Sequence, residues 1–187
     1  MKNFPTYAAK HAYIQAQATF LQGIAGQCDY AITLQTNLRT YAVADSTVRA
    51  RVAATEKALT KFRLRMNQLL TGNGWRRKAA YVPLFVAAIE GVGEKDKTLH
   101  IHAALGNTGH RATEETRALL EQGFRQIWLN TQVGTEQAGL MVAADDVKVV
   151  LIDRARDAGW LGYMGKEAKH KGRWEVIDWA NAQGITG

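Results

Sequence analysis

The sequence predicts an α+β fold in which a central antiparallel β-sheet is flanked by helices. Segments with apolar residues at three- or four-residue spacing alternate with segments in which every second residue is apolar, in the order α-β-α-β-β-α-β-α. Two adjacent strands are joined by a tight turn, which implies antiparallel pairing. No repeat or interdomain linker divides the chain. We therefore expect one domain over residues 1–187, with a core at about 28–170 and an N-terminal helix and a C-terminal tail appended.

The first part of the chain is expected to contain two helices and one strand. Residues 6–24 have apolar side chains at helical spacing. Residues 30–36 alternate between apolar and small or polar side chains, which predicts a strand with one buried face. Residues 46–71 form the clearest helix, with Ser46 as its expected N-cap and glycine at position 72 after its end.

A hairpin of two strands is expected in the middle of the chain. Residues 81–90 and 98–105 are rich in apolar and β-branched side chains, and a glycine-rich, charged turn at 91–97 joins them. Pro83 cannot donate a backbone hydrogen bond, so the first half of the first strand should be irregular or at an edge.

The remaining elements are a helix, a strand and a second helix. Thr113 is the expected N-cap of the first of these helices, and the acidic side chains after it favour the positive end of the helix dipole. Residues 147–152 predict a strand. Residues 154–169 predict a last helix, which contains several glycines. The tail to Gly187 has no clear pattern.

Composition indicates a globular protein that binds a polyanion. Apolar residues make up 47% of the chain and charged residues 22%, and no apolar run is long enough to span a membrane. The single cysteine, Cys28, excludes an intrachain disulfide and a zinc site built from several cysteines, and it is consistent with a reducing cytoplasm. The formal net charge of +7 favours nucleic acid as the partner, although many basic proteins bind none.

A metal site is predicted on the middle hairpin. His100 and His102 lie two residues apart on the second strand, so both imidazoles face the same way. If the strands pair across the turn, Glu90 lies opposite one of the histidines and shares their face. Two nitrogens and one carboxylate suit Mn²⁺ or Mg²⁺ and leave positions open for a phosphate. Without a metal, the histidines would be ordinary structural or surface groups.

A nucleophile is predicted on the last helix. Tyr163 and Lys166 lie three residues apart, so they share a helix face. A phenol is a poor nucleophile at neutral pH, because its pKa is about 10. A nearby ammonium group favours the phenolate and offsets charge on a phosphate. An amphipathic helix with a half-buried tyrosine would show the same spacing.

Together these motifs resemble the HUH endonuclease family, which includes replication initiators and relaxases. Residues 30–36 look like the family's first motif. Residues 99–105 contain the histidine–hydrophobe–histidine sequence that gives the family its name, and Glu90 is placed like the acidic third ligand of initiators from small circular-DNA replicons. The segment Tyr163-Met-Gly-Lys166 matches the Tyr-x-x-Lys motif of single-tyrosine initiators. The resemblance covers most of the chain.

The resemblance implies a sequence-specific single-stranded DNA endonuclease and strand transferase. A divalent Mn²⁺ or Mg²⁺ ion held by His100, His102 and Glu90 would polarise the scissile phosphate. Tyr163 would attack it to leave a 5′-phosphotyrosine and a free 3′-hydroxyl, and Lys166 would orient the phosphate or lower the tyrosine pKa. The implied role is to start rolling-circle replication of a plasmid or phage in the cytoplasm of a bacterial cell. The expected partners are single-stranded DNA at an origin hairpin or nick site and a host helicase or polymerase, with no membrane partner.

Several basic and polar side chains are candidates for holding the DNA strand. Thr33 and Gln35, on the polar face of the first strand, could meet base edges or the backbone. The basic candidates, which could equally serve solubility, are Arg76, Arg77, Lys78, Lys169, Lys171 and Arg173.

Two alternatives stay open. A mobilisation relaxase or a transposase of the same superfamily would share the two histidines, although the transposases generally lack the lysine after the tyrosine. A non-catalytic module that binds single-stranded nucleic acid would place aromatic rings on the central strands. The face of residues 100–104 that carries the histidines has none.

Overall fold

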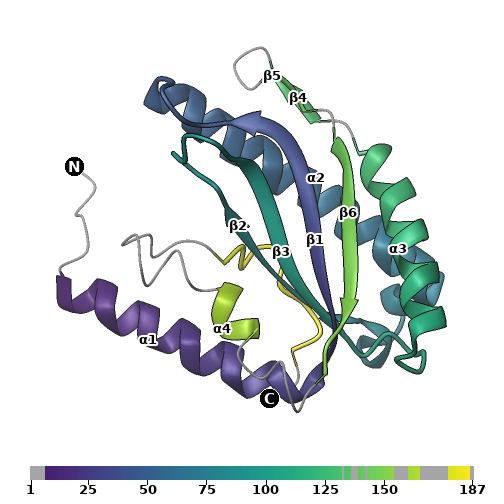
Figure 1. The fold of residues 1–187 in the computed structure, drawn as a ribbon. Coiled ribbons are helices and arrows are strands. Elements are labelled where there is room, and N and C mark those ends of the chain that lie inside the picture. The colour runs from purple at the N-terminus through teal and green to yellow at the C-terminus, as the bar shows by residue number, and fades with distance from the viewer. Residues whose placement is uncertain are drawn as a thin grey trace.

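The computed structural model of the protein describes residues 7–131, 133–135, 139–141, 143–153, 160–164 and 177–185. These residues form an antiparallel sheet with helices on both faces, which confirms the predicted α+β class (Figure 1). The sheet has four strands in the order β2-β3-β1-β6, namely β1 (Cys28–Arg39), β2 (Leu84–Glu90), β3 (Thr98–Gly106) and β6 (Ala143–Leu151). A separate hairpin contains β4 (Val133–Thr135) and β5 (Gly139–Met141). The helices are α1 (Tyr7–Ile24), α2 (Asp45–Thr71), α3 (Glu114–Leu129) and α4 (Trp160–Met164), and 3₁₀ turns lie at Ala25–Gln27, Gly74–Arg76 and Ala79–Tyr81.

One face of the sheet packs against α2 and α3 to form the larger core. The alternating apolar residues of β1, including Ile32 and Leu34, are fully buried there, as the sequence pattern predicts. Phe62 of α2 meets Phe124 and Trp128 of α3 edge-on, with ring centroids 5.5 and 5.9 Å apart. Such edge-on contacts add to the stabilisation from apolar burial. This core fixes the strands whose other face carries the histidines.

The opposite face is covered in part by α1, α4 and the segment 177–185. Its smaller apolar cluster contains Leu21, Ile24, Cys28, Leu84, Val86, Ala88, Ala104, Leu161, Met164 and Ile177. In Figure 1, α4 lies between α1 and this face of the sheet. The cluster covers the end of the sheet where β2 begins and β3 ends. The other end of the same face carries the polar residues considered below.

Several element boundaries differ from those predicted. The N-cap of α2 is Ala44 rather than Ser46, because the helix begins at Asp45, whose carboxylate favours the positive end of the helix. Strand β2 begins at Leu84 because a 3₁₀ turn precedes it. Thr113 caps α3 as predicted, with its hydroxyl accepting a hydrogen bond from the Thr116 amide at 3.2 Å. The hairpin of β4 and β5 lies between the predicted helix that Thr113 caps and the predicted strand at 147–152, where we assigned no element.

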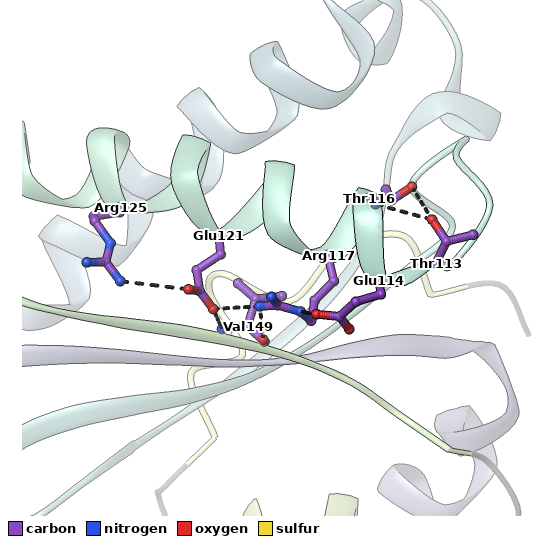
Figure 2. A network of polar contacts seen from close by, with 7 residues as sticks. All are labelled: Thr113, Glu114, Thr116, Arg117, Glu121, Arg125 and Val149. Atoms are coloured by element: carbon purple, nitrogen blue, oxygen red, sulfur yellow. Dashed lines mark hydrogen bonds and ion pairs between the residues drawn. The ribbon is translucent and has the colours of Figure 1, made fainter.

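The outer edge of β6 is covered by side chains of α3 (Figure 2). The Val149 amide donates to the Glu121 carboxylate at 3.0 Å, and the Val149 carbonyl accepts from Arg117 at 3.0 Å. Arg125 donates to the Val147 carbonyl at 3.2 Å. Arg117 also pairs with Glu121 at 2.9 Å, which holds the two side chains together over the strand. These hydrogen bonds occupy backbone groups of the edge strand that could otherwise pair with another strand.

The outer edge of β2 is covered by residues 177–185. The backbones of Phe85 and Gln183 exchange two hydrogen bonds of 3.0 Å, and the Asp178 amide donates to the Ala87 carbonyl at 2.9 Å. Two side chains of α2 fix this segment, because Arg63 and Asn67 donate to the Gln183 side chain at 2.8 and 3.0 Å. The tail that showed no sequence pattern therefore extends the sheet on this side.

Candidate metal centre

The hairpin of β2 and β3 brings the three predicted metal ligands together. Its register pairs Glu90 with His100 and Ala88 with His102. Residues that are paired in this way share a sheet face, and so do residues two apart on one strand. Glu90, His100 and His102 therefore project from the same face, as predicted.

The ligand atoms of the three side chains converge. Glu90 Oε2 lies 3.6 Å from His100 Nε2 and 3.8 Å from His102 Nε2. One ligand atom from each residue lies within 4.8 Å of the others, which is close enough to hold one metal ion. Glu90 is fully buried, and a carboxylate taken out of water is costly unless positive charge or hydrogen-bond donors compensate it. A cation between the three groups would supply that charge.

Both imidazole rings are oriented by oxygen atoms behind them. His100 Nδ1 lies 3.0 Å from the Thr98 carbonyl oxygen, which can only accept, so Nδ1 carries the proton. His102 Nδ1 lies 3.1 Å from Thr33 Oγ1. With a metal on Nε2, this Nδ1 also carries a proton and donates to the hydroxyl. Such partners fix the tautomer and the orientation of metal-binding histidines.

Thr33, which the sequence suggested as a DNA contact, lies beside one of the candidate metal ligands. We named it as a DNA contact, because it lies on the polar face of β1. The register of β1 and β3 pairs it with His102, and its hydroxyl contacts the imidazole. Gln35 pairs with His100 in the same register. The face of β1 that we assigned to DNA therefore borders the candidate metal site directly.

Gly91 is a site residue that sequence reasoning missed. Its φ angle is +86°, which disfavours any residue with a side chain. A Cβ atom here would lie 2.3 Å from the Thr98 carbonyl oxygen and 3.0 Å from His100 Nδ1. These two atoms form the hydrogen bond that orients His100, so the added atom would disrupt that bond. The available signal in the sequence was a glycine directly after a candidate ligand.

Replacing Gly91 with alanine should weaken metal binding by about 10- to 100-fold, the usual cost of disturbing a partner of a metal ligand. The measurement is the affinity for Mn²⁺, read by electron paramagnetic resonance. Gly109→Ala is the matched control, because Gly109 also has a positive φ, +77°, but has nothing within 4 Å of an added Cβ. Equal Mn²⁺ affinity in the two variants would show that the space beside His100 is unimportant.

The turn between β2 and β3 is tied to the end of β1. The Thr40 hydroxyl donates to the Gly91 carbonyl at 3.3 Å and accepts from the Gly93 amide at 2.6 Å. Lys97 and Glu94 form an ion pair at 2.9 Å within the turn. These contacts hold the turn beside the histidines.

A polar cavity of about 310 Å³ adjoins the histidines. The strands contribute Gln35, Thr98, His100 and His102 to its lining, and the turn contributes Asp96 and Lys97. Gln35 belongs to β1, so the cavity lies on the β1 side of the histidines, whereas Glu90 of β2 lies on the other side. A bound ion would therefore sit next to a space that can admit part of a substrate.

Helix α4, which contains Tyr163, packs on the same sheet face as the three candidate ligands. Its residues Leu161 and Met164 are buried in a cluster with Ala88 and Ala104. Ala88 pairs with His102, and Ala104 lies two residues after it on the same face. The helical position of Tyr163 is as predicted, within the short stretch that is described. Lys166 lies outside the described residues.

Three of the six basic residues predicted to hold DNA lie among the described residues, in one loop. The loop before β2 contains Arg76, Arg77 and Lys78, which are all exposed. This loop leads to Leu84, the first residue of β2, whereas Glu90 is the last residue of that strand. The predicted contacts Lys169, Lys171 and Arg173 lie outside the described residues.

Lys148 of β6 is a basic residue that sequence reasoning did not single out. It is exposed, and it pairs with Thr33, which in turn pairs with His102. The three residues thus form a row across the sheet on the face of the candidate metal site. The position of Lys148 beside the site could not be predicted without the strand order, which places β6 next to β1.

Comparison with known proteins adds no relative. No protein-family model, curated protein or solved structure matches the chain. Among the residues that the structure describes, no helix combines the length and the apolar character needed to cross a membrane. What the structure establishes at the site is therefore the geometry: a buried glutamate and two histidines of an antiparallel hairpin that can hold a metal ion.

Proposed function

We propose that this protein is a metal-dependent endonuclease and strand transferase for single-stranded DNA, which starts rolling-circle replication of a plasmid or phage in the bacterial cytoplasm. The observation that carries the proposal is the convergence of Glu90, His100 and His102 on the sheet face against which α4 packs. A candidate metal site and a tyrosine-bearing helix on one face are the two parts that this reaction needs.

The donor set supports Mn²⁺ or Mg²⁺ as the ion. The carboxylate is a hard oxygen ligand, and two imidazoles raise the affinity for Mn²⁺ relative to an all-oxygen site. Three protein ligands leave further coordination positions for phosphate oxygens and water. When bound, the ion would act as a Lewis acid and a template on the scissile phosphate.

Tyr163 is the proposed nucleophile. Its phenolic oxygen would form a bond to phosphorus as the bond from phosphorus to the 3′-oxygen breaks. The phenolic proton would leave to solvent or a nearby base, and the leaving 3′-oxygen would take up a proton from solvent. The products are a 5′-phosphotyrosine and a free 3′-hydroxyl. Lys166 would stabilise the phenolate and the charge on the phosphate. Because the bond to tyrosine replaces the phosphodiester, the reverse reaction would rejoin the strand without a nucleotide cofactor.

The row of Lys148, Thr33 and His102 suggests how the strand crosses the sheet. Neighbouring strands lie about 4.8 Å apart, so Lys148 is on the order of 10 Å from His102 across two strand spacings. A phosphate next to the scissile group could meet the Lys148 ammonium over this distance. Contacts of this kind are independent of sequence and weaken as salt increases.

Replacing Lys148 with alanine should therefore weaken binding to single-stranded DNA and reduce its salt dependence. Loss of one phosphate contact lowers the slope of log K against log salt by about 0.7 for single strands. Fluorescence anisotropy with a labelled oligothymidine, measured over a series of salt concentrations, gives the slope. Lys57→Ala is the control, because Lys57 is exposed on α2, across the sheet from the histidines. An unchanged slope in Lys148→Ala would remove Lys148 from the DNA path.

The proposed activity can be tested with two pools of random single-stranded oligonucleotides, one labelled at the 3′ end and the other at the 5′ end. After incubation with the protein and Mn²⁺, denaturing electrophoresis separates covalent adducts from free DNA. A 5′-phosphotyrosine retains the 3′ part of the cleaved strand, so only the 3′ label should migrate with the protein. The adduct should also form with Mg²⁺ and disappear in excess chelator.

Other results of this experiment identify the alternatives. DNA that binds at low salt but never becomes covalently attached would favour the non-catalytic binding module. A 5′ label that migrates with the protein would indicate attachment to a 3′-phosphate and would contradict the proposed chemistry. Equal adduct formation in excess chelator would remove the metal from the reaction.

A further inference from the structure

The polar cavity beside His100 and His102 has the chemistry of a site for a neutral group that forms hydrogen bonds. All of its lining residues are polar or charged, so it offers hydrogen-bonding groups beside the carbon atoms of the same side chains, a mixed surface that suits a flat polar ring. Its one lysine, Lys97, is already paired with Glu94 at 2.9 Å, and Asp96 adds a negative charge. The turn as a whole has no net charge, because Glu94 and Asp96 balance Lys95 and Lys97, so it offers a phosphate no excess of positive charge.

We propose that this cavity receives one unstacked base of the DNA strand, and that it selects a base with an exocyclic amino group. This inference rests on the proposed function, because the occupant is a nucleotide of the proposed substrate. The volume, about 310 Å³, is at the small end of the range for ligand sites in proteins. The histidines form one wall of the cavity, so the base would belong to a nucleotide next to the scissile phosphate.

Gln35 and Asp96 supply the selection. The Gln35 amide offers one donor and one acceptor group, and by rotation it can match the edge of any base. The Asp96 carboxylate only accepts, so it favours a base whose amino group presents hydrogens. Adenine, cytosine and guanine have such a group and thymine has none. The pair of side chains therefore predicts discrimination against thymine at one position.

The backbone of Gln35 is held in a fixed place, which such selection requires. The Gln35 carbonyl accepts a hydrogen bond from the indole nitrogen of buried Trp128 at 2.7 Å on the other side of the sheet. The residue is also paired with His100 in the register of β1 and β3. The side chain is partly exposed and faces the cavity, so its replacement leaves these backbone contacts intact.

The test is a binding selection from a random pool of single-stranded oligonucleotides in the presence of Mn²⁺, followed by sequencing of the retained molecules. The wild-type protein should enrich a motif that contains a position where thymine is depleted about tenfold or more. Gln35→Ala and Asp96→Ala should lose that depletion at this position alone and keep the rest of the motif. Gln68→Ala, an exposed glutamine of α2, should behave as wild type. The recovered base distinguishes adenine, cytosine and guanine.

The outcomes separate this inference from the proposed function. If the wild-type protein selects a motif and both variants select the same motif with the same strength, the cavity does not read a base, while the proposed function stands. Enrichment of thymine at the position that the variants affect also overturns the inference. If the wild-type protein retains no single-stranded DNA, the inference and the proposed function are both wrong.

Discussion

Replacing Tyr163 with phenylalanine is expected to abolish the covalent DNA adduct and to leave folding and DNA binding nearly unchanged. Only the phenolic oxygen is removed, so the ring is retained and no large cavity forms. The oxygen is the atom proposed to attack phosphorus, so the variant has no nucleophile at this position. Denaturing electrophoresis with 3′-labelled DNA and Mn²⁺ measures the adduct, and circular dichroism verifies folding.

Phenylalanine variants of two other tyrosines are the controls for Tyr163→Phe. Tyr41 and Tyr81 are 48% and 50% exposed, so Tyr41→Phe and Tyr81→Phe should fold normally and retain the adduct. Lys166→Ala should reduce the rate by roughly 10- to 1000-fold, because it removes electrostatic help and leaves the nucleophile. If Tyr163→Phe still forms the adduct and another variant does not, the nucleophile is misplaced but the enzyme class stands. If no tyrosine variant has an effect, the proposed class is wrong.

Replacing Glu90 with glutamine is expected to remove the stabilisation of the fold by Mn²⁺. An ion that binds only the folded state, present at about 100 times its dissociation constant, stabilises that state by about 2.7 kcal/mol. Glu90→Gln keeps the size of the buried side chain but removes the charge that would balance the ion. Without metal the variant should be at least as stable as the wild type, because an amide is less costly to bury than a carboxylate.

Thermal unfolding with and without Mn²⁺ measures this effect. His102→Ala should also lose the stabilisation, whereas His110→Ala should keep it, because His110 is exposed in the loop before α3 and outside the candidate site. The two site variants, Glu90→Gln and His102→Ala, should also form no covalent adduct. A Glu90→Gln protein that Mn²⁺ stabilises as strongly as the wild type would exclude the carboxylate from the ligand set.

Sequence alone was sufficient to predict the three candidate ligands because their placement depends on local rules. Residues that are two positions apart on a strand share a face of the sheet. A tight turn between two strands implies that they form an antiparallel hairpin. Glu90 could therefore be assigned to the face of His100 and His102 before its exact partner was known. The alternation in β1 likewise predicted which of its residues are buried against α2 and α3.

The surroundings of the site depend on contacts that the sequence does not encode locally. Thr33 and His102 are 69 residues apart, and their hydrogen bond depends on the pairing of β1 with β3. Lys148 joins the same face only because β6 lies beside β1. The collision that an added Cβ at Gly91 would cause depends on backbone coordinates. The strands of the β4–β5 hairpin, three residues each, are too short for alternation to be recognised.

The most direct test of the central claim is a calorimetric titration of chelator-treated protein with Mn²⁺. We predict one saturable site per chain in the wild type and in His110→Ala, and no such site in Glu90→Gln or His102→Ala. Competition with Mg²⁺ in the same experiment would show whether both ions use the site. The claim is contradicted if the wild-type protein binds neither ion saturably, or if the variants at Glu90 and His102 bind Mn²⁺ with the affinity of the wild type.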